Sequence, residues 1–414
     1  MAKSEIVCGL DMGSSRVVCV IGTPDPEGHG MRILGGASVP CRGLKGGVVL
    51  NIHETARAVR AAVEKAEEQA HQMVHGVYLG IRGSHLSSFN NKGAYNIART
   101  DKEITEEDVR AVIEIAKAIP ISQDREILHV IPQSYGLDRT RGVPNPVGME
   151  GSLLEVDVHI ITASSGHLNN VSRAVAEAGF EVIEPVYSLL ALGELLVSPE
   201  ERELGSLLMD FGGHTVSLGI YSEGAIRYSK ELAIGADFIT RDLAIGLRTN
   251  MATAEKLKIE HGAAHPSLFP EDGEKEIVFK GVDGRSEQRV KPSSIMNILL
   301  PRVEQIFTVV GEEVQNSTFA DLVVPGGVVL TGGGAVLRGI PQAAEQILNM
   351  PARQGLPHPD LVHAADTLMT PTFSTALGLV CYPSAKGFTL SATGPKRSDS
   401  RLVRRVKKWF EDLF

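Results

Sequence analysis

Residues 207–226 combine side chains that suit phosphate binding. An apolar strand ends at Asp210, Gly212 and Gly213 follow it, and Thr215 adds a hydroxyl before the next apolar strand. Because glycines lack a β-carbon, main-chain N–H groups in such a turn can approach an anion closely. The sequence therefore predicts a β-hairpin whose turn binds phosphate. A single Asp-x-Gly turn is also common in ordinary hairpins, so this turn alone does not identify a nucleotide site.

Residues 6–22 contain a second copy of this turn. Aligned at the strand ends, it has the matching acid, glycine and small residue, followed by one more hydroxyl: Asp11, Gly13, Ser14 and Ser15. Two such turns facing each other would hold a polyphosphate from both sides. The carboxylates of Asp11 and Asp210 would repel the polyphosphate. Neither turn contains a Lys that could offset this repulsion, and no other cation is expected nearby. Asp11 and Asp210 are therefore predicted to orient a hydrated Mg²⁺ ion, which keeps several waters near nucleotide phosphates.

The composition is typical of a soluble globular protein with room for two sizeable cores. The chain has 414 residues, 43% of them hydrophobic and 22% charged, with a formal net charge of −9. This charge and the aromatic content of 5% disfavour nucleic acid as a partner. The four cysteines show no CxxC spacing, and neither a signal peptide nor an apolar run of about 18 residues occurs, so a reducing, cytoplasmic location is predicted.

Strand and helix patterns alternate after the first turn. The apolar spacing predicts a strand over 31–40, a helix over 54–72, strands over 77–81 and 156–163, a helix over 169–178 and a strand over 180–183. Residues 84–158 interrupt this series with polar strands and a helix capped by Thr105, which predicts a small inserted subdomain. The strand over 126–137 contains Pro132, and proline favours the edge of a sheet.

The second half contains a run of three glycines between a strand and a helix. Four further helices are predicted, over 187–197, 252–261, 295–314 and 371–382. The strand that begins at residue 328 leads into Gly332, Gly333 and Gly334, where backbone could touch a flat ligand or a neighbouring helix. The small residues Ala376 and Gly378 predict close packing of the last helix against the helix over 187–197.

Five motifs occur in an order that is more specific than any one of them: DMGSS, EPVYSLLALG, DFGGHT, LTGGGAVLRGI and STALGLVCY. In this order they resemble the phosphate, connecting and adenosine motifs of the actin and heat-shock-chaperone ATPase superfamily. Within that superfamily, LHVIPQSYGLD, NPVGMEG and PGGVVLTGGGA resemble the FtsA family of bacterial cell-division proteins, and the match covers nearly the whole chain. The resemblance implies an α/β, actin-like fold with two related lobes, a nucleotide cleft between them and an inserted subdomain of the FtsA type.

This resemblance also implies a division of the chain into segments. The expected segments are the first lobe core (1–83 and 159–198, with the connecting helix), the inserted subdomain (84–158), the second lobe core (199–232 and 295–382), its small subdomain (233–294), a flexible linker (383–400) and an amphipathic membrane-targeting helix (401–414).

Carried onto this sequence, the resemblance assigns positions that bind ATP with Mg²⁺. The nucleotide-binding positions are Asp11, Gly13, Ser14 and Ser15 in the first turn, Asp210, Gly212, Gly213 and Thr215 in the second, Gly235 after it, Gly332, Gly333 and Gly334 in the adenosine motif, and the pair Glu255 and Lys258. By spacing alone, Glu255 and Lys258 share one helix face and predict a solvated salt bridge. Glu184 matches the position that orients an attacking water, whereas its surroundings alone predict a carboxylate at a helix start.

Three positions depart from the superfamily pattern and predict slow hydrolysis. His214 replaces a small residue, Ser217 stands where a second acid is frequent, and Arg16 replaces a small residue or a lysine. Fold alone does not choose among the functions of the superfamily. A metabolite kinase would need a further base over a second substrate pocket, and a chaperone would need a long substrate-binding domain. A pilus-assembly relative is the nearest alternative to the cell-division function.

The cell-division function implies particular partners and a particular location. The resemblance implies self-assembly into filaments, tethering of FtsZ filaments (the Z ring), and recruitment of later division proteins at the septum. It places the protein on the inner face of the cytoplasmic membrane at the division site. Among the subdomains that do not bind nucleotide, residues 233–294 are the predicted docking site for FtsZ.

Residues 401–414 have the pattern of an amphipathic helix that lies on a membrane surface. At 100° per residue one face gathers Leu402, Val403, Val406, Trp409, Phe410, Leu413 and Phe414. The other face carries Arg401, Arg404, Arg405, Lys407 and Lys408 against only two acids. A cationic segment in an acidic protein indicates anionic lipid, and Trp and Phe favour the interface. Docking on the protein's own core is the alternative, against which the polar linker argues.

Overall fold

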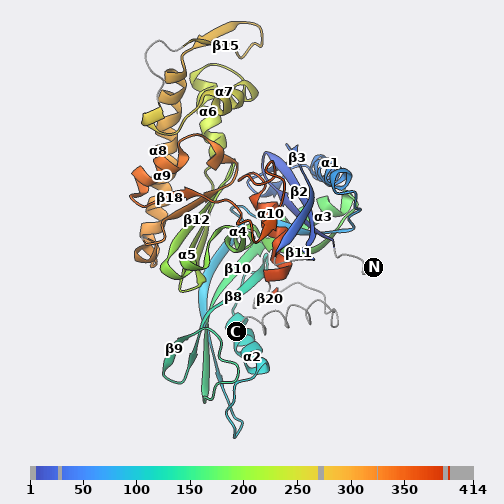
Figure 1. The fold of residues 1–414 in the computed structure, drawn as a ribbon, viewed down its shortest axis with the longest axis vertical. Helices are drawn as coiled ribbons and strands as arrows, with labels where there is room; N and C mark the ends of the chain where they lie inside the picture. The colour runs from blue at the N-terminus through green and yellow to red at the C-terminus, as the bar shows by residue number, and fades with distance from the viewer. Residues whose placement is uncertain (1–5, 27–29, 269–274, 324, 386–389, 392–414) are drawn as a thin grey trace.

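The computed structural model describes residues 6–26, 30–268, 275–323, 325–385 and 390–391. Two lobes, each built on a twisted sheet, lie side by side, and a third sheet extends away from them along the long axis of the molecule (Figure 1). Within the described residues, the structure contains no helix with the length and apolarity needed to cross a membrane.

The first lobe has a six-stranded sheet in the order β11-β6-β1-β2-β3-β19. These strands are β1 (Val7–Met12), β2 (Arg16–Pro24), β3 (Met31–Pro40), β6 (Gly76–Ile81), β11 (Glu181–Tyr187) and β19 (Val362–His363). Strand β1 is antiparallel to β2 and parallel to β6. A short hairpin of β4 (Leu44–Lys45) and β5 (Val48–Val49) lies beside the sheet. The predicted strand over 31–40 is confirmed.

Helices cover both faces of this sheet. Helix α1 (Ile52–Ala70), with α3 (Ser165–Glu177) against it, packs on one face, and α10 (Ser374–Ala385) packs on the other. Asn51 caps α1 by accepting a hydrogen bond from the backbone of Glu54. A β-carbon on Gly35 would lie 2.7 Å from the carbonyl oxygen of Ala66, so the helix approaches the strand more closely than any side chain would allow.

The second lobe repeats this strand arrangement. Its sheet has the order β14-β13-β12-β17-β18, formed by β12 (Ser206–Phe211), β13 (Val216–Ser222), β14 (Ala225–Leu232), β17 (Val328–Thr331) and β18 (Ala352–Gln354). Strand β12 is antiparallel to β13 and parallel to β17, as β1 is to β2 and β6. One face packs on α8 (Pro292–Asn316) and α9 (Ile340–Leu348) in a core where Phe211 meets Phe307 edge to face. The repeat predicted from the turns is therefore present in the whole strand pattern.

Helices α4 (Ser188–Leu196) and α10 lie against each other between the two sheets (Figure 1). A β-carbon on Gly378 would lie 2.5 Å from the carbonyl oxygen of Ala191. The predicted close packing of these two helices is confirmed. A short helix, α5 (Pro199–Leu204), then leads into β12.

The small subdomain of the second lobe lies at one end of the molecule, at the top of Figure 1. It contains α6 (Ala236–Gly246), α7 (Met251–His261), the 3-10 turn η1 (Pro266–Leu268) and a hairpin of β15 (Ile277–Lys280) and β16 (Glu287–Val290). The helix predicted over 252–261 is confirmed as α7. The sequence patterns identified neither α6 nor the hairpin.

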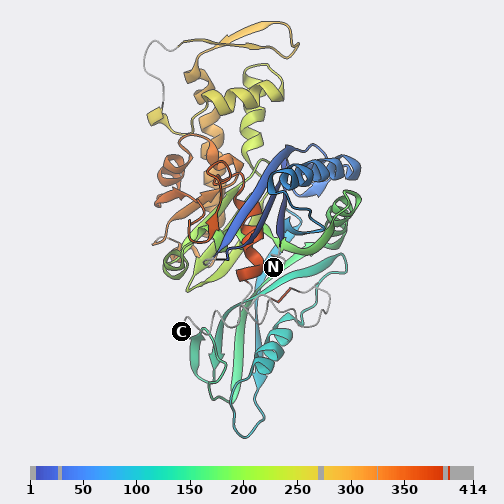
Figure 2. The same cartoon turned by 45° about the vertical axis from the view of Figure 1, so that its right-hand side comes forward.

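The inserted subdomain lies at the opposite end, where Figure 2 shows a helix packed on one face of a long sheet. The sheet is formed by β7 (Leu86–Asn96), β8 (Arg125–Leu137), β9 (Thr140–Val143), β10 (Leu153–Ser164) and β20 (Leu390–Ser391), and the helix is α2 (Glu106–Lys117). Thr105 caps α2 in a capping box with Asp108. The predicted cap is confirmed.

Two predictions, an edge position for the strand with Pro132 and a helix start at Glu184, were wrong. Strand β8 is not an edge strand, because β10 pairs with one side of it and β9 and β20 pair with parts of the other. Its Pro132 lies at a bulge between those two short pairings, so the missing N–H interrupts no bond there. Glu184 and Pro185 do not begin a helix; they lie in β11, and proline is tolerated because β11 is an edge strand.

Part of the C-terminal region lies within the described residues. Helix α10 continues to Ala385, three residues into the segment predicted as a linker, and Leu390–Ser391 pair with β8. The remainder of 383–400, and all of the predicted membrane helix 401–414, lie outside the described residues.

Candidate functional site

The two predicted phosphate turns have the same backbone geometry. In the first, Gly13 N donates to the carbonyl oxygen of Arg16 at 2.9 Å; in the second, Gly212 N donates to the carbonyl oxygen of Thr215 at 3.0 Å. These pairs are equivalent in the alignment of the two turns. Each bond closes a tight turn directly after a strand whose second-last residue is a buried aspartate, Asp11 or Asp210.

The turns also lie close to each other across the space between the lobes. A β-carbon on Gly213 would lie 2.9 Å from Ser15 Oγ, so residues of opposite turns are near neighbours. Ser14 Oγ accepts a hydrogen bond from Gly46 N at 2.8 Å, which ties the first turn to the loop between β4 and β5. The structure thus brings together the turn residues that the sequence predicted as a phosphate site.

The N-terminus of α6 is joined to the second turn. Ala236 N and Asp237 N donate to the carbonyl oxygens of Gly212 and Gly213 at 3.0 and 2.8 Å. A β-carbon on Gly235 would lie 2.4 Å from the carbonyl oxygen of Gly213, so only glycine fits at this predicted position.

His214, one of the departures, projects from the second turn toward the same helix. Its Nδ1 atom lies 2.6 Å from Asp237 Oδ2, and this pair lowers the pKa of Asp237 against the opposing effect of burial. The imidazole therefore pairs with an acid at the mouth of the turn.

A cation that the sequence did not predict lies between the two aspartates. Arg82 follows β6, and its Nη2 atom is 2.9 Å from Asp11 Oδ1 while its Nη1 atom is 3.1 Å from Asp210 Oδ2. Nη2 also donates to Thr375 Oγ1 on α10 at 2.8 Å. The expectation that no cation is near Asp210 was wrong, because β6 lies beside β1 and ends at the same level of the sheet.

These charges shift one another's protonation equilibria. Burial raises the pKa of Asp11 to about 6, although the positive charge of Arg82 lowers it and the charge of Asp210 raises it. Burial alone would lower the pKa of Arg82, but the nearby carboxylates outweigh that effect and raise it. Arg82 therefore remains positively charged in this site.

A second residue that the sequence analysis missed is Glu231 on β14. It is opposite Ser217 in the pairing of β13 with β14, and its Oε2 accepts a hydrogen bond from Gly83 N at 3.1 Å. Burial raises the pKa of Glu231 to about 7, against the lowering effects of the Ser217 hydroxyl and of Arg82. Ser217 is the position where the superfamily often has an acid, and here an acid from the neighbouring strand lies beside it.

The three glycines after β17 have different surroundings. A β-carbon on Gly332 would lie 2.3 Å from Asp210 Oδ1, and one on Gly334 would lie 2.7 Å from the ring of Phe211. Only glycine at these positions leaves room for the Asp210 carboxylate and the Phe211 ring. A β-carbon on Gly333 would meet no described atom within 4 Å, so this is the glycine of the run that faces open space.

Glu255 and Lys258 lie on one face of α7, as predicted, and form an ion pair. Lys258 Nζ is 2.7 Å from Glu255 Oε2 and 2.9 Å from Thr240 Oγ1 on α6. Lys258 is buried whereas Glu255 is partly exposed, so the pair is only partly solvated. It joins α6 to α7 next to the second turn.

The structure places Glu184 away from the two aspartates. It pairs with Tyr78 of β6, which in turn pairs with Gly9 of β1, so Glu184 is two strands from β1 and two residues below the level of Asp11. Its role in orienting water remains a prediction, and the geometry brings Glu231 nearer to the charged cluster.

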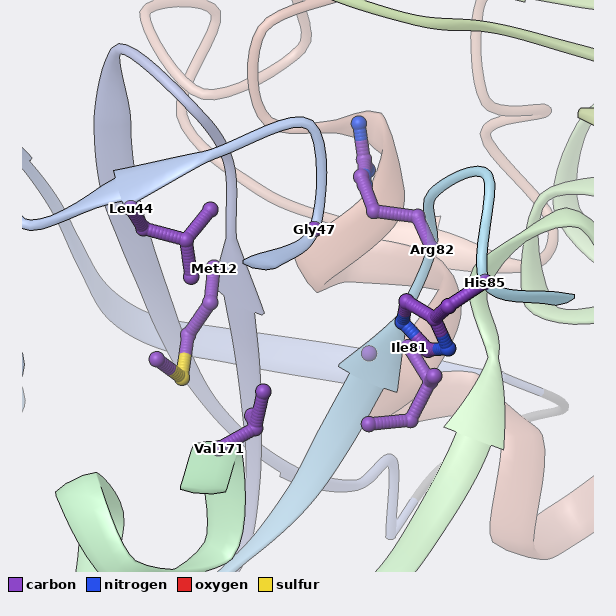
Figure 3. A pocket seen from close by; sticks show the side chains of 8 residues that line it. Met12, Leu44, Gly47, Ile81, Arg82, His85 and Val171 are labelled. Atoms are coloured by element: carbon purple, nitrogen blue, oxygen red, sulfur yellow. The ribbon is translucent and has the colours of Figure 1, made fainter. Parts of the chain in front are cut away.

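Figure 3 shows a narrow cavity beside the charged cluster. It is lined by Met12, Leu44, Gly47, Gly80, Ile81, Arg82, His85 and Val171. The Arg82 side chain extends away from His85 and Ile81, and burial lowers the pKa of His85 to about 4. The lining of the cavity therefore includes a neutral imidazole as well as the residue that carries the guanidinium.

Asp11 and Asp210 have the chemistry expected of ligands for the predicted Mg²⁺ ion. Carboxylate oxygens are the ligands that Mg²⁺ prefers, and Asp210 Oδ1 is a buried acceptor that receives no hydrogen bond from any described residue. The residues therefore fit a cation held by Asp11 and Asp210 through water. Because Arg82 contacts both carboxylates, such a cation would compete with the guanidinium for them.

Two lobes of repeated topology, with a pair of turns facing each other between them, define the class of actin-like ATPase folds. The structure is similar to that of the PilM–PilN type IV pilus biogenesis complex, with a TM-score of 0.67, 18% identity, and coverage of 91% of this chain and 98% of that one. It is also similar to MreB5 of Spiroplasma citri bound to AMPPNP, with a TM-score of 0.53, 15% identity and full coverage of both chains. Identities this low establish the fold alone.

Sequence comparison gives the family. The chain belongs to the FtsA family of cell division proteins. The family model for the SHS2 domain inserted in FtsA matches residues 83–162, and the model for cell division protein FtsA matches residues 207–378. The chain is 33% identical to FtsA of Pseudomonas aeruginosa and 36% identical to FtsA of Neisseria meningitidis, in each case over 100% of this chain and 99% of the relative.

Proposed function

We propose that this protein is an ATP-binding, actin-like cell-division protein that assembles into filaments. It tethers FtsZ filaments to the cytoplasmic membrane through residues 401–414 and recruits later division proteins. The observation that carries the proposal is the pair of phosphate turns, which face each other with Asp11 and Asp210 held by one guanidinium between them. Family membership supplies the division role, and relatives of the same length carry the name FtsA.

ATP is the proposed ligand of the site between the turns. Its phosphates would lie against the backbone of the turns 13–15 and 212–215, and its adenosine against the glycine run 332–334 with Glu255 and Lys258 nearby. The open space at Gly333 supports an approach of the ligand there. MreB5, which has the same fold, was solved with AMPPNP. When bound, Mg²⁺ would supply positive charge beside the phosphates, and Asp11 and Asp210 would orient its waters.

Hydrolysis by this site is proposed to be slow, so that ATP acts mainly as a structural ligand. Glu184, the matched candidate for orienting water, lies two strands from β1. Glu231 accepts a hydrogen bond from Gly83 and carries a raised pKa, which reduces its fraction of ionised base near neutral pH. Several turnovers per second on a small metabolite would contradict this proposal and favour a metabolite kinase.

FtsZ is the proposed protein partner, and the small subdomain 233–294 is its proposed docking site. Large apolar side chains are exposed there, including Ile245, Ile259 and Val282. The test is capture of the chain by an immobilised C-terminal peptide of FtsZ. Ile259→Glu should reduce capture, whereas Met73→Glu, an equally exposed apolar position on the first lobe, should not. Undiminished capture of the Ile259→Glu protein would move the docking site elsewhere.

Electron microscopy on anionic lipid, with and without ATP, tests the proposal as a whole. A polymerising tether should form membrane-bound filaments whose abundance depends on ATP. A soluble enzyme of the same fold would form none. Filaments that do not bind the lipid surface would favour the alternative of a pilus-assembly type of ATPase.

A further inference from the structure

The backbone that carries Arg82 is fixed between the two lobes. A β-carbon on Gly47 would lie 2.1 Å from the carbonyl oxygen of Arg82, and one on Gly83 would lie 2.4 Å from the carbonyl oxygen of Gly46. Gly83 also donates its N–H to Glu231 of the second lobe. The backbone beside Arg82 therefore has close neighbours in both lobes, and rotation of the side chain is the simplest way for Arg82 to change its contacts.

Arg82 has both the burial and a free donor expected of a ligand-binding residue. Its side chain is 10% exposed, and its Nε–H has no acceptor among the described residues. A buried, unpartnered N–H is unfavourable, and a guanidinium is well suited to bind phosphate and carboxylate oxygens together. The guanidinium thus forms ion pairs with the two aspartates, and its Nε–H becomes available to an acidic ligand when the side chain rotates.

The repeated strand pattern shows that Arg82 stands at a special position of the first lobe. Asp11 pairs with Gly80 of β6, and Asp210 pairs with Thr331 of β17. Two residues further along, the first lobe has Arg82 and the second has Gly333, which faces open space. At equivalent positions, one lobe therefore supplies a positive charge to the site and the other leaves room.

We propose that Arg82 is a phosphate-site residue that neutralises Asp11 and Asp210 when no divalent cation is bound, so that this chain binds a nucleoside triphosphate even without Mg²⁺. The inference rests on the proposed function. Two carboxylates alone would repel a polyphosphate, whereas two carboxylates with a guanidinium between them repel it far less. A hydrated cation and the guanidinium repel each other. The guanidinium therefore binds the aspartates when the cation has dissociated, and the cation binds them when the guanidinium has moved away.

The test is the ratio of two equilibrium dissociation constants for ATP, one in excess EDTA and one in excess Mg²⁺. For the parent we expect a ratio of about threefold or less, and for Arg82→Gln a ratio of about tenfold or more, because the variant depends on the cation to neutralise the aspartates. Arg202→Gln is the matched control, since Arg202 is another buried arginine, paired with Glu194 outside the site. Its ratio should equal that of the parent.

Arg82→Lys keeps the charge but loses the planar fork that reaches both aspartates. Its ratio should lie between those of the parent and Arg82→Gln. If Arg82→Gln does not fold, a ratio of Arg82→Lys above that of the parent still tests whether Arg82 neutralises the aspartates. Circular dichroism of the nucleotide-free proteins monitors folding. Equal ratios in the parent and in the Arg82 variants would overturn the inference and leave nucleotide binding intact. If no protein bound ATP in either buffer, the proposed function would fall together with the inference.

Discussion

Four ionic side chains from strands far apart in the sequence meet at one point of this molecule. Asp11 lies in β1, Asp210 in β12 and Glu231 in β14, and Arg82 directly follows β6. The cluster contains three acids and one base, and burial is the main reason why the pKa values of Asp11 and Glu231 are raised, with the charge of Asp210 adding to the effect on Asp11. A site with this balance is arranged to change its charge when a polyphosphate or a cation enters.

Asp210→Ala should remove the benefit that Mg²⁺ gives to ATP binding. Without this carboxylate the cation loses one of its two predicted acceptors, so ATP affinity in Mg²⁺ should fall toward the affinity in EDTA. Isothermal titration in both buffers measures the effect. Asp157→Ala, which removes an ion-paired aspartate of β10 outside the site, is the control. Equal ATP affinities of Asp210→Ala and parent, with and without EDTA, would exclude a metal role for Asp210.

His159 is a buried histidine between the inserted subdomain and the second lobe. Its Nδ1 lies 2.6 Å from Asn90 Oδ1 and its Nε2 lies 2.8 Å from Ser229 Oγ on β14. Burial lowers the pKa of His159 to about 3. The unfolded chain therefore binds a proton that the folded protein does not, below the ordinary histidine pKa of about 6.5. The neutral ring's contribution to stability is complete above that pH and is lost as pH falls toward 3.

His159→Gln should make folding less sensitive to acid. Between about pH 6.5 and pH 5, the fall in the free energy of unfolding should be smaller than in the parent by about 2 kcal/mol, from the linkage slope of one proton. Urea unfolding at a series of pH values measures this difference. His75→Gln, at an exposed histidine, should follow the parent. Parallel curves for His159→Gln and parent would show that His159 is not the titrating group.

At the scale of elements, the contact between α4 and α10 joins the two lobes. Gly378→Ala should destabilise the protein by about 1–3 kcal/mol, because its β-carbon would lie 2.5 Å from the backbone of Ala191 and one helix must move. Gly166→Ala in α3 is the matched control: apart from its own helix, no described atom lies within 4 Å of the added β-carbon, so helix propensity should stabilise it by about 0.5–1 kcal/mol. Urea midpoints compare the two. A neutral Gly378→Ala would mean that the helices separate at little cost.

Local patterns were sufficient to predict the elements that have a clear apolar periodicity or characteristic turn residues. The two hairpins, α1, β3, α7 and the small residues of α10 follow from apolar spacing and glycines, and the structure confirms them. Glu231 was missed because β14 was missed. The sequence did contain a signal for the turn before β14, because Glu223-Gly224 is an X-Gly pair between apolar runs. In the structure both residues have positive φ, as in the tight turns of hairpins.

Other features depend on which strands become neighbours, and local patterns do not contain that information. Arg82 reaches Asp11 because β6 pairs in parallel with β1 across 70 or so residues of intervening chain. Glu184 was expected at a helix start from its local surroundings, yet parallel pairing with β6 keeps it in a strand. In both cases the sheet, rather than the local sequence, decides where the charged group lies.

At the scale of the whole molecule, the inserted subdomain leaves the first lobe after β6 and bonds to the second. Side chains of β7 and β8 donate to carbonyl oxygens of β14: Ser88 to Ser229, Asn90 to Arg227 and Gln133 to Ile226. The same strand β14 carries Glu231, which accepts from Gly83. Strand β14 therefore contacts both the charged cluster of the proposed phosphate site and the inserted subdomain.

Membrane attachment is the property of the whole molecule that rests on sequence alone, because residues 401–414 lie outside the described residues. Each large apolar side chain of the predicted helix that inserts could contribute about 1.5–3 kcal/mol before the cost of ordering the helix. Each basic residue could add about 1 kcal/mol near an anionic surface. One helix should therefore bind reversibly, and filaments that carry many should remain bound, since the effective concentration is high once the first helix has bound.

Trp409→Glu, or deletion from Ser400 onward, should release the protein from anionic liposomes and leave ATP binding unchanged. The substitution places a charge in the centre of the predicted apolar face, whereas Ser400→Glu adds the same charge just before the helix and should retain most binding. Sedimentation with vesicles of increasing anionic lipid content measures attachment, and binding of the parent should weaken with salt because part of the attraction is electrostatic. If the truncated protein sedimented as fully as the parent, the membrane anchor would lie in another part of the chain.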